Sequence, residues 1–594
     1  MNSKQIRSVL VITFAVVLCW LTAPLWGGGE STDSSIPQSP PAFDAEQAFR
    51  MTGEFVTQNP KRVLGSLEAR QATGYLQGVL QRLGYTVSFS HFDALVAGRR
   101  QAGRNITAFR AGMSPGVIAV AAHYDTARTT VQGATDNGAG VGVLLELARV
   151  FTVSPLRHSL VIVASDGGEW SLAGSADLAA NYPGRRNIMA ALSLDGVSAG
   201  ELAGLRLDAE GQRSGYSPPW LRRLAFRAAG GQDLPVLAPS GFREYFEHAL
   251  GWARTDQGSF LNAGIPAINL GSGSADELVA REICHSPQDT IANLKTESLR
   301  KYGAAAERIL RALDGLGAVP AGSMKSFAWK DDAFVSGWAA TVLHVLAFLP
   351  LFAMVAFGWI RCRRSLCSGT VLRETVFFLA WLAPFALVFS LILFFRLLKF
   401  LPLSGLYPAP LKDPVLESPA WGLMAGIVAG ALAVGVGLHF LARFLTRGQP
   451  RSWDESRTLL MTFLAIVVVM ALLYNSYWAV TFLAFPALIW GAVGRGRGAV
   501  GRTAAALAIL AAGFMFYFLA VFAAIRLDAG WRILWYATLG LSSGMLSWQG
   551  YFLAASATAL GLRFLSLQIR GTGHATPEFS SSGRPIPSGN SGVA

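Results

Sequence analysis

Two patterns of hydrophobic and polar positions divide the chain near residue 330. Between about residues 42 and 320, short apolar runs alternate with longer amphipathic segments. This alternation predicts an α/β domain with a mainly parallel sheet between layers of helices, a three-layer sandwich. We predict a helix over 66–83 and strands over 117–122, 159–164, 189–194 and 265–270.

Beyond residue 335 the apolar runs become long enough to cross a membrane. They lie near 338–360, 372–395, 420–442, 458–474, 477–494, 503–526 and 545–565. Because about 20 apolar residues span a bilayer, residues 335–570 are predicted to form a transmembrane α-helical bundle of about seven spans. Residues 531–565 fit either one long span or a tight hairpin. The Ser-, Gly- and Pro-rich tail, 571–594, is predicted to be disordered.

The first 27 residues are predicted to form a transmembrane anchor helix. Residues 1–7 are short and basic, and 8–26 are apolar and uncharged. A cleaved signal peptide is the rival interpretation, but no small-residue cleavage site follows. Residues 28–41 form a polar linker, so 42–320 is the globular domain.

The formal net charge of +13 is concentrated beside the apolar runs. The arginines of three clusters are Arg361, Arg363 and Arg364; Arg443, Arg447, Arg451 and Arg457; and Arg495, Arg497 and Arg502. With eight membrane helices, all three clusters fall on the inner side and residues 42–320 fall outside. The predicted partner is therefore a lipid bilayer rather than nucleic acid, and no protein partner is indicated. We expect a bacterial inner-membrane protein with a periplasmic domain, or alternatively an endomembrane protein with a lumenal domain.

Several predicted strands end in a carboxylate or an imidazole. His123 and Asp125 follow one strand, Asp166 and Glu169 the next, and Asp195 a third. Asp136 opens a helix and His285 precedes another. Ligands of an open α/β sheet collect at the carboxyl ends of its strands, and this mixture of nitrogen and oxygen donors suits a pair of zinc ions.

The order of these motifs resembles the M28 family of zinc aminopeptidases and carboxypeptidases. The resemblance covers roughly residues 45–315 and rests on the segments His123-Tyr-Asp125, Asp136-Asn-Gly, Asp166-Gly-Gly-Glu169, Leu-Asp195 and His285-Ser-Pro-Gln-Asp289-Thr. The architecture also resembles the membrane metallopeptidases of the vacuole and endoplasmic reticulum and their bacterial relatives.

The resemblance implies a role for each of these residues. His123 and Asp195 would hold one zinc, Glu169 and His285 the other, and Asp136 would bridge the two. Asp125 would orient His123. Tyr124, Asp166, Asp256 and Asp289 are assigned more weakly, as residues that would support the metal ligands or line a substrate pocket. The Asp136–Asn137 bond would be cis.

One position departs from the family pattern. The family usually has Asp-Gly-Glu-Glu where this chain has Asp166-Gly-Gly168-Glu169, so glycine replaces the usual general-base glutamate. Losing a general base typically costs about 10²–10⁴-fold in rate. From sequence alone, Gly168→Glu is expected to raise activity.

Three functions remain open at this stage. The first is a membrane-bound metallo-exopeptidase acting on exported peptides, with reduced catalysis. The second is a metal-binding pseudoenzyme that recognises peptides or scaffolds a membrane partner. The third is an acyltransferase resembling glutaminyl cyclases, against which the two-metal ligand set argues.

Overall fold

The computed structural model describes residues 39–569, except 97–98, 212–214, 231–233, 252, 331–332, 402–418, 450–451, 497, 514–516, 518–520, 522–529 and 545. The predicted anchor, most of the predicted linker and the predicted tail lie outside the described residues.

The N-terminal domain is built on one eight-stranded sheet, ordered β1-β2-β4-β3-β5-β8-β6-β7. The central pairs β4–β3, β3–β5 and β5–β8 are parallel, whereas β1–β2, β2–β4 and β8–β6 are antiparallel. The strands are β1 (Thr86–Val96), β2 (Arg99–Arg110), β3 (Ser114–His123), β4 (His158–Ser165), β5 (Ile188–Leu194), β6 (Leu202–Asp208), β7 (Val236–Leu237) and β8 (Ala267–Ser274).

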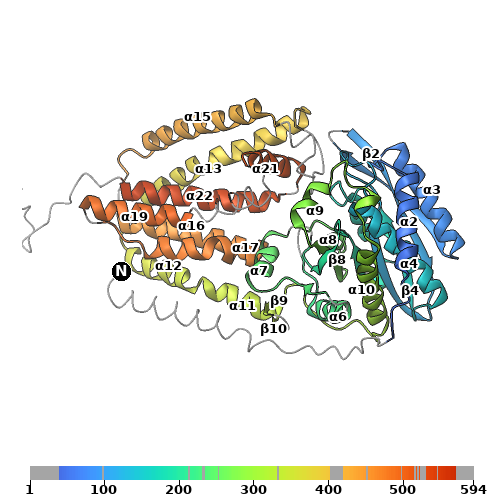
Figure 1. Ribbon diagram of the computed structural model, residues 1–594. Helices are drawn as coiled ribbons and strands as arrows, with labels where there is room; N and C mark the ends of the chain where they lie inside the picture. The colour runs from blue at the N-terminus through green and yellow to red at the C-terminus, as the bar shows by residue number, and fades with distance from the viewer. Residues whose placement is uncertain are drawn as a thin grey trace, which may run out of the picture.

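Both faces of the central strands are buried, which explains their continuous apolar sequence. Along β3, Ile118 and Val120 enter the core cluster on one face, while Ala119 and Ala121 enter the cluster on the other. The first face packs against α3 (Leu67–Arg82), α4 (Ala139–Val153), α6 (Pro219–Ala229) and α10 (Thr296–Asp314), and α2 (Ala45–Gln58) packs on α4 and α10. Helices α5 (Ala173–Asn181) and α8 (Gln257–Asn262) cover the second face. The mainly parallel α/β sandwich predicted from the sequence is therefore confirmed (Figure 1).

The α-helices of this domain lie before, between and after its strands along the chain. They are α2 (Ala45–Gln58), α3 (Leu67–Arg82), α4 (Ala139–Val153), α5 (Ala173–Asn181), α6 (Pro219–Ala229), α7 (Gly241–Leu250), α8 (Gln257–Asn262), α9 (Glu277–Ile283) and α10 (Thr296–Asp314). A small hairpin of β9 (Phe327–Lys330) and β10 (Ala333–Val335) follows.

The C-terminal part is helical. Its described helices are α11 (Gly337–Ala347), α12 (Leu349–Cys362), α13 (Ser368–Leu397), α15 (Trp421–Leu445), α16 (Trp453–Tyr474), α17 (Ser476–Ala479), α18 (Phe485–Ala492), α19 (Gly498–Gly513), α21 (Arg532–Ser543) and α22 (Trp548–Ile569).

Five helical segments in the described part are long and apolar enough to cross a membrane: Gly337–Cys362, Ser368–Leu397, Trp421–Leu445, Trp453–Tyr474 and Trp548–Ile569. The predicted spans 477–494 and 503–526 correspond to shorter apolar helices, Ser476–Ala492 and Gly498–Gly513, within the described residues. The ambiguous stretch 531–565 contains two helices, α21 and α22.

A buried charge cluster ties the helical part together. Glu374 on α13 is fully buried, and its two carboxylate oxygens accept hydrogen bonds from Arg563 on α22 at 2.8 and 3.0 Å. Arg373 Nη2 donates to the same carboxylate at 2.8 Å. A buried carboxylate needs such partners to offset its desolvation, so this cluster fixes α13 against α22.

Among the described residues, two contacts between the helical part and the α/β domain stand out. At the first, Asn475 donates a hydrogen bond to the carbonyl of His248 at 2.9 Å, and Tyr477 donates to the carbonyl of Lys325 at 2.6 Å. At the second, Trp170 of the α/β domain shares an apolar cluster with Ile392 and Trp535. Figure 1 shows α17 lying against α7 at the first contact.

Candidate metal centre

The ends of three adjacent parallel strands carry the side chains of the candidate centre. His123 is the last residue of β3, Glu169 lies in the turn after β4, and Asp195 directly follows β5. The short segment η2 (Ala134–Gly138), just before α4, supplies Asp136, which has a non-helical backbone conformation, and His285 follows α9. Strand order therefore brings together residues that are up to 162 positions apart along the chain.

Asp136 lies between the two histidines. Its Oδ1 is 3.4 Å from His123 Nε2, and its Oδ2 is 2.8 Å from His285 Nε2. Each oxygen thus faces a different imidazole, an arrangement that suits a carboxylate bridging two metal ions. The Asp136–Asn137 bond is cis, as the family resemblance implied.

The cluster has two halves, one around His123 and one around His285. Asp195 belongs to the first half and Glu169 to the second. Glu169 Oε2 is 3.2 Å from His285 Nε2, and Asp195 Oδ1 is 3.7 Å from His123 Nε2. Glu169 Oε1 is buried and has no hydrogen-bond partner among the described residues. A buried carboxylate oxygen without a partner is costly, and a metal ligand bond would satisfy it.

Two further carboxylates hold the ligand-bearing loops. Asp125 lies 3.3 Å from His123 Nδ1 and accepts hydrogen bonds from the backbone N–H groups of Gly168 and Glu169 at 2.8 and 3.2 Å. It therefore orients the imidazole and the turn after β4 together, a support that ligating histidines commonly have.

Asp289 holds the backbone of the loop that carries Asp136. Its carboxylate accepts from the backbone N–H and the hydroxyl of Thr135 at 2.7 and 2.9 Å, and from the N–H of Asp136 at 3.2 Å. Since Asp289 lies four residues after His285, the two halves of the site are fixed to each other.

The electrostatics of the cluster favour bound positive charge. Burial alone would raise the pKa of Asp136, but His285 and His123 hold it well below its usual range. Burial alone would lower the pKa values of both histidines, but the surrounding acidic groups raise them well above 6.5. Burial raises the pKa values of Glu169 and Asp195. Three carboxylates gathered in one buried site favour bound cations, and divalent metals can fill that role.

The spacing of the donor atoms fits zinc. Tetrahedral zinc with bonds of about 2.0–2.1 Å to nitrogen and oxygen places neighbouring ligand atoms about 3.3 Å apart. The four ligand-to-ligand separations given above lie between 2.8 and 3.7 Å. The residues present therefore fit zinc at two positions that share Asp136.

Gly168 packs directly against a candidate ligand. A Cβ atom built on this residue would lie 2.4 Å from Cγ and 2.5 Å from Cβ of His123, closer than real Cβ contacts come. Its φ is not in the left-handed region, whereas that of Gly167 is +68°. Close approach to the imidazole, rather than backbone conformation, is what requires glycine here. The sequence-based expectation that glutamate at this position raises activity is therefore physically unsound.

The weaker predicted site residues divide into two groups. Asp256 accepts a hydrogen bond from Ser165 at 2.6 Å, and its charge acts on Asp195, so it lies beside the first half of the cluster. Asp166 instead accepts from the backbone N–H groups of Arg104 and Gly167, and burial next to Asp125 raises its pKa to about 7.

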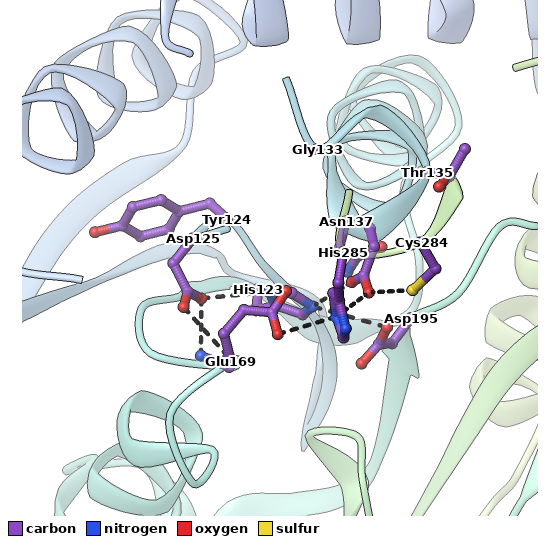
Figure 2. A network of polar contacts seen from close by, with 12 residues as sticks. His123, Tyr124, Asp125, Gly133, Thr135, Asn137, Glu169, Asp195, Cys284 and His285 are labelled. Carbon is purple, nitrogen blue, oxygen red and sulfur yellow. Dashed lines mark hydrogen bonds and ion pairs between the residues drawn. The ribbon is translucent and has the colours of Figure 1, made fainter. Parts of the chain in front are cut away.

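The assignment of Tyr124 to a substrate pocket is wrong. Its side chain is fully buried and its hydroxyl donates to the carbonyl of Arg104 at 2.8 Å. Figure 2 shows its ring pointing away from His123 and His285. Alternation along the chain explains this, because successive side chains at a strand end point to opposite faces of the sheet.

The sequence favours a small packed residue rather than a nucleophile at Cys284, and the structure places this residue in the cluster. Its thiol donates a hydrogen bond to Asp136 Oδ2 at 3.3 Å. The adjacent His285 was the only available sequence signal, because the contact with Asp136 joins residues 148 positions apart.

Comparison with known proteins identifies a peptidase domain in this chain. Residues 105–310 match Peptidase family M28, so the chain carries an M28 peptidase domain. A probable zinc metalloprotease of Pyricularia oryzae is 30% identical over 151 residues, covering 24% of this chain and 27% of that protein. Aminopeptidase YwaD of Bacillus subtilis is 27% identical over 193 residues, covering 32% and 39%. The matched region thus spans less than half the length of either relative.

Two solved structures from Bacteroides thetaiotaomicron are also similar. A glutaminyl cyclase bound to N-acetylhistamine has 20% identity and a TM-score of 0.39, covering 46% of this chain and 99% of its own. A leucine aminopeptidase precursor has 21% identity and a TM-score of 0.38, covering 47% and 99%.

Proposed function

We propose that this chain is a membrane-bound zinc metallopeptidase of the exopeptidase type that acts on exported peptides. The observation that supports it most is the position of Asp136, whose two oxygens face His123 and His285 separately. Such a bridging carboxylate is a feature of two-metal hydrolytic sites. His123 and Asp195 would hold one zinc, and Glu169 and His285 the other.

The protein's own groups set the geometry for hydrolysis. Zinc, when bound, supplies Lewis-acid polarisation of the scissile carbonyl and lowers the pKa of water. Asp125 fixes the orientation of His123 and of the Glu169 turn, and Asp289 fixes Asp136. Gly168 offers no side chain to accept a proton, so we expect turnover to be slow.

The alternative is a metal-binding pseudoenzyme that recognises peptides or scaffolds a membrane partner. The packing of Gly168 against His123 favours it, because this contact leaves no room for the usual base.

Zinc analysis and a substrate panel on the full chain in detergent test these proposals together. We expect about two zinc ions per chain and slow release of amino-terminal residues from short peptides, abolished by a chelator and restored by zinc. A chain that binds zinc and peptides without any turnover would support the pseudoenzyme, and a chain that binds no zinc would contradict both functions.

The proposed location places the peptidase domain outside the inner membrane, with the three arginine clusters inside. A topology reporter fused after Gly322 is expected to be active as a periplasmic or lumenal fusion, because the positive-inside rule keeps the clusters cytoplasmic. A reporter fused after Arg364 is expected to behave as cytoplasmic. The reverse pattern of the two fusions would rule out this orientation.

A further inference from the structure

The thiol of Cys284 lies among the donor atoms of the second half of the metal cluster. It immediately follows α9 and precedes His285 in the chain. Its Sγ is 3.3 Å from Asp136 Oδ2, and His285 Nε2 is 2.8 Å from the same oxygen. Ligand atoms of these three residues all lie within 4.8 Å of one another, close enough to hold one ion.

A second observation points to a ligand at the same place. Glu169 is 5% exposed, and its Oε1 has no hydrogen-bond partner among the described residues while its Oε2 faces His285. The buried half of the cluster therefore presents an unsatisfied oxygen next to a thiol, an imidazole and the Asp136 carboxylate. Figure 2 shows the thiol of Cys284 directed at the carboxylate that His285 also faces.

We propose that Cys284 is a protein ligand of the second zinc, together with Asp136, Glu169 and His285. This inference rests on the proposed function, because it concerns the same metal site. Zinc bonds of about 2.3 Å to sulfur and about 2.0 Å to oxygen place the two atoms about 3.5 Å apart in a tetrahedron. The observed separation of 3.3 Å needs only a small adjustment. On binding, the thiol proton passes to solvent and the thiolate coordinates the ion.

The extra ligand makes the two metal positions unequal. Four protein ligands close the second position, as in structural zinc sites, whereas catalytic zinc keeps one position open. Within the part of the chain that the structure describes, the first position has His123, Asp195 and the shared Asp136 as protein ligands. Substrate would therefore meet the first ion, and the second would hold Asp136 and the α9 end in place.

Cobalt substitution tests the assignment without measuring activity. The full-length protein in detergent is stripped with a chelator and given two equivalents of Co²⁺. A thiolate ligand adds a sulfur-to-cobalt charge-transfer band in the near ultraviolet, beside the visible bands that any bound Co²⁺ gives. We expect this band in the wild type and its loss in Cys284→Ser and Cys284→Ala, with the visible bands retained. The second equivalent of zinc should bind these variants at least about tenfold more weakly.

Cys367→Ser is the matched control, since Cys367 lies at the start of α13, far along the chain from the cluster. The control should keep the charge-transfer band. A wild-type protein with visible cobalt bands but no thiolate band would overturn the role of Cys284 and leave the metallopeptidase proposal standing. If the charge-transfer band persists in both Cys284 variants, the ligand role of Cys284 is overturned as well. A protein that binds neither cobalt nor zinc would contradict the proposed function itself.

Discussion

Replacing Asp136 with alanine is expected to empty both metal positions. The variant removes the one carboxylate whose two oxygens face His123 and His285, at 3.4 and 2.8 Å. Each ion loses a ligand, and the shared bond between the two halves disappears. We expect zinc content to fall from about two ions per chain to a small fraction, and peptide hydrolysis to drop by at least about 10²-fold.

Metal analysis after extensive dialysis checks this result. Asp93→Ala is a suitable control because Asp93 is exposed on the edge strand β1. It should keep its zinc and its activity. An Asp136→Ala protein with full zinc content would contradict the assignment of Asp136 as the bridging ligand.

Adding a side chain at position 168 is expected to damage the metal centre. In Gly168→Ala the new Cβ would meet the imidazole of His123 at about 2.4 Å, so either the ring or the turn must move. Overpacking of this kind typically costs about 1–3 kcal/mol of stability. The displaced imidazole should bind the first zinc more weakly, and any hydrolytic activity should fall at least about tenfold. Gly168→Glu should be worse, although the sequence alone predicts the opposite sign.

Thermal unfolding and zinc titration of both variants provide the measurement. Gly273→Ala is the matched control, because Gly273 lies on β8 in the same sheet and a Cβ there meets nothing within 4 Å. A stable Gly168→Glu protein with full zinc and faster hydrolysis would contradict the packing argument and restore the missing-base explanation.

The central strands and the ends that carry ligands could be predicted from sequence because both follow from local pattern. The apolar run before His123 is buried on both faces of the sheet. A strand of this kind can be predicted from its continuous hydrophobic sequence alone. Strand β2, which lies between the edge strand β1 and β4, was not predicted. Its sequence is rich in arginine, and it pairs with β1 where polar side chains reach solvent.

Contacts between distant residues could not be predicted in this way. The sequence shows that Gly168 lacks a side chain, but the reason is the imidazole of His123, 45 positions earlier. The thiol of Cys284 meets Asp136 only because α9 returns to the strand ends. The ion pair of Glu374 with Arg563 likewise joins two helices 189 positions apart.

The contact of Trp170 with the helical part bears on how the peptidase domain can be isolated. Trp170 directly follows Glu169, and its indole is 2% exposed within the cluster that includes Leu64, Ile392 and Trp535. Cutting the chain near residue 320 would remove Ile392 and Trp535 and expose the indole of Trp170 to solvent, directly beside the turn that carries Glu169. Burial of a large apolar side chain contributes about 1.5–3 kcal/mol, and a truncated fragment would forfeit it. The excised domain would therefore differ from the intact chain beside a candidate metal ligand, so zinc binding and peptide hydrolysis should be measured on the intact chain.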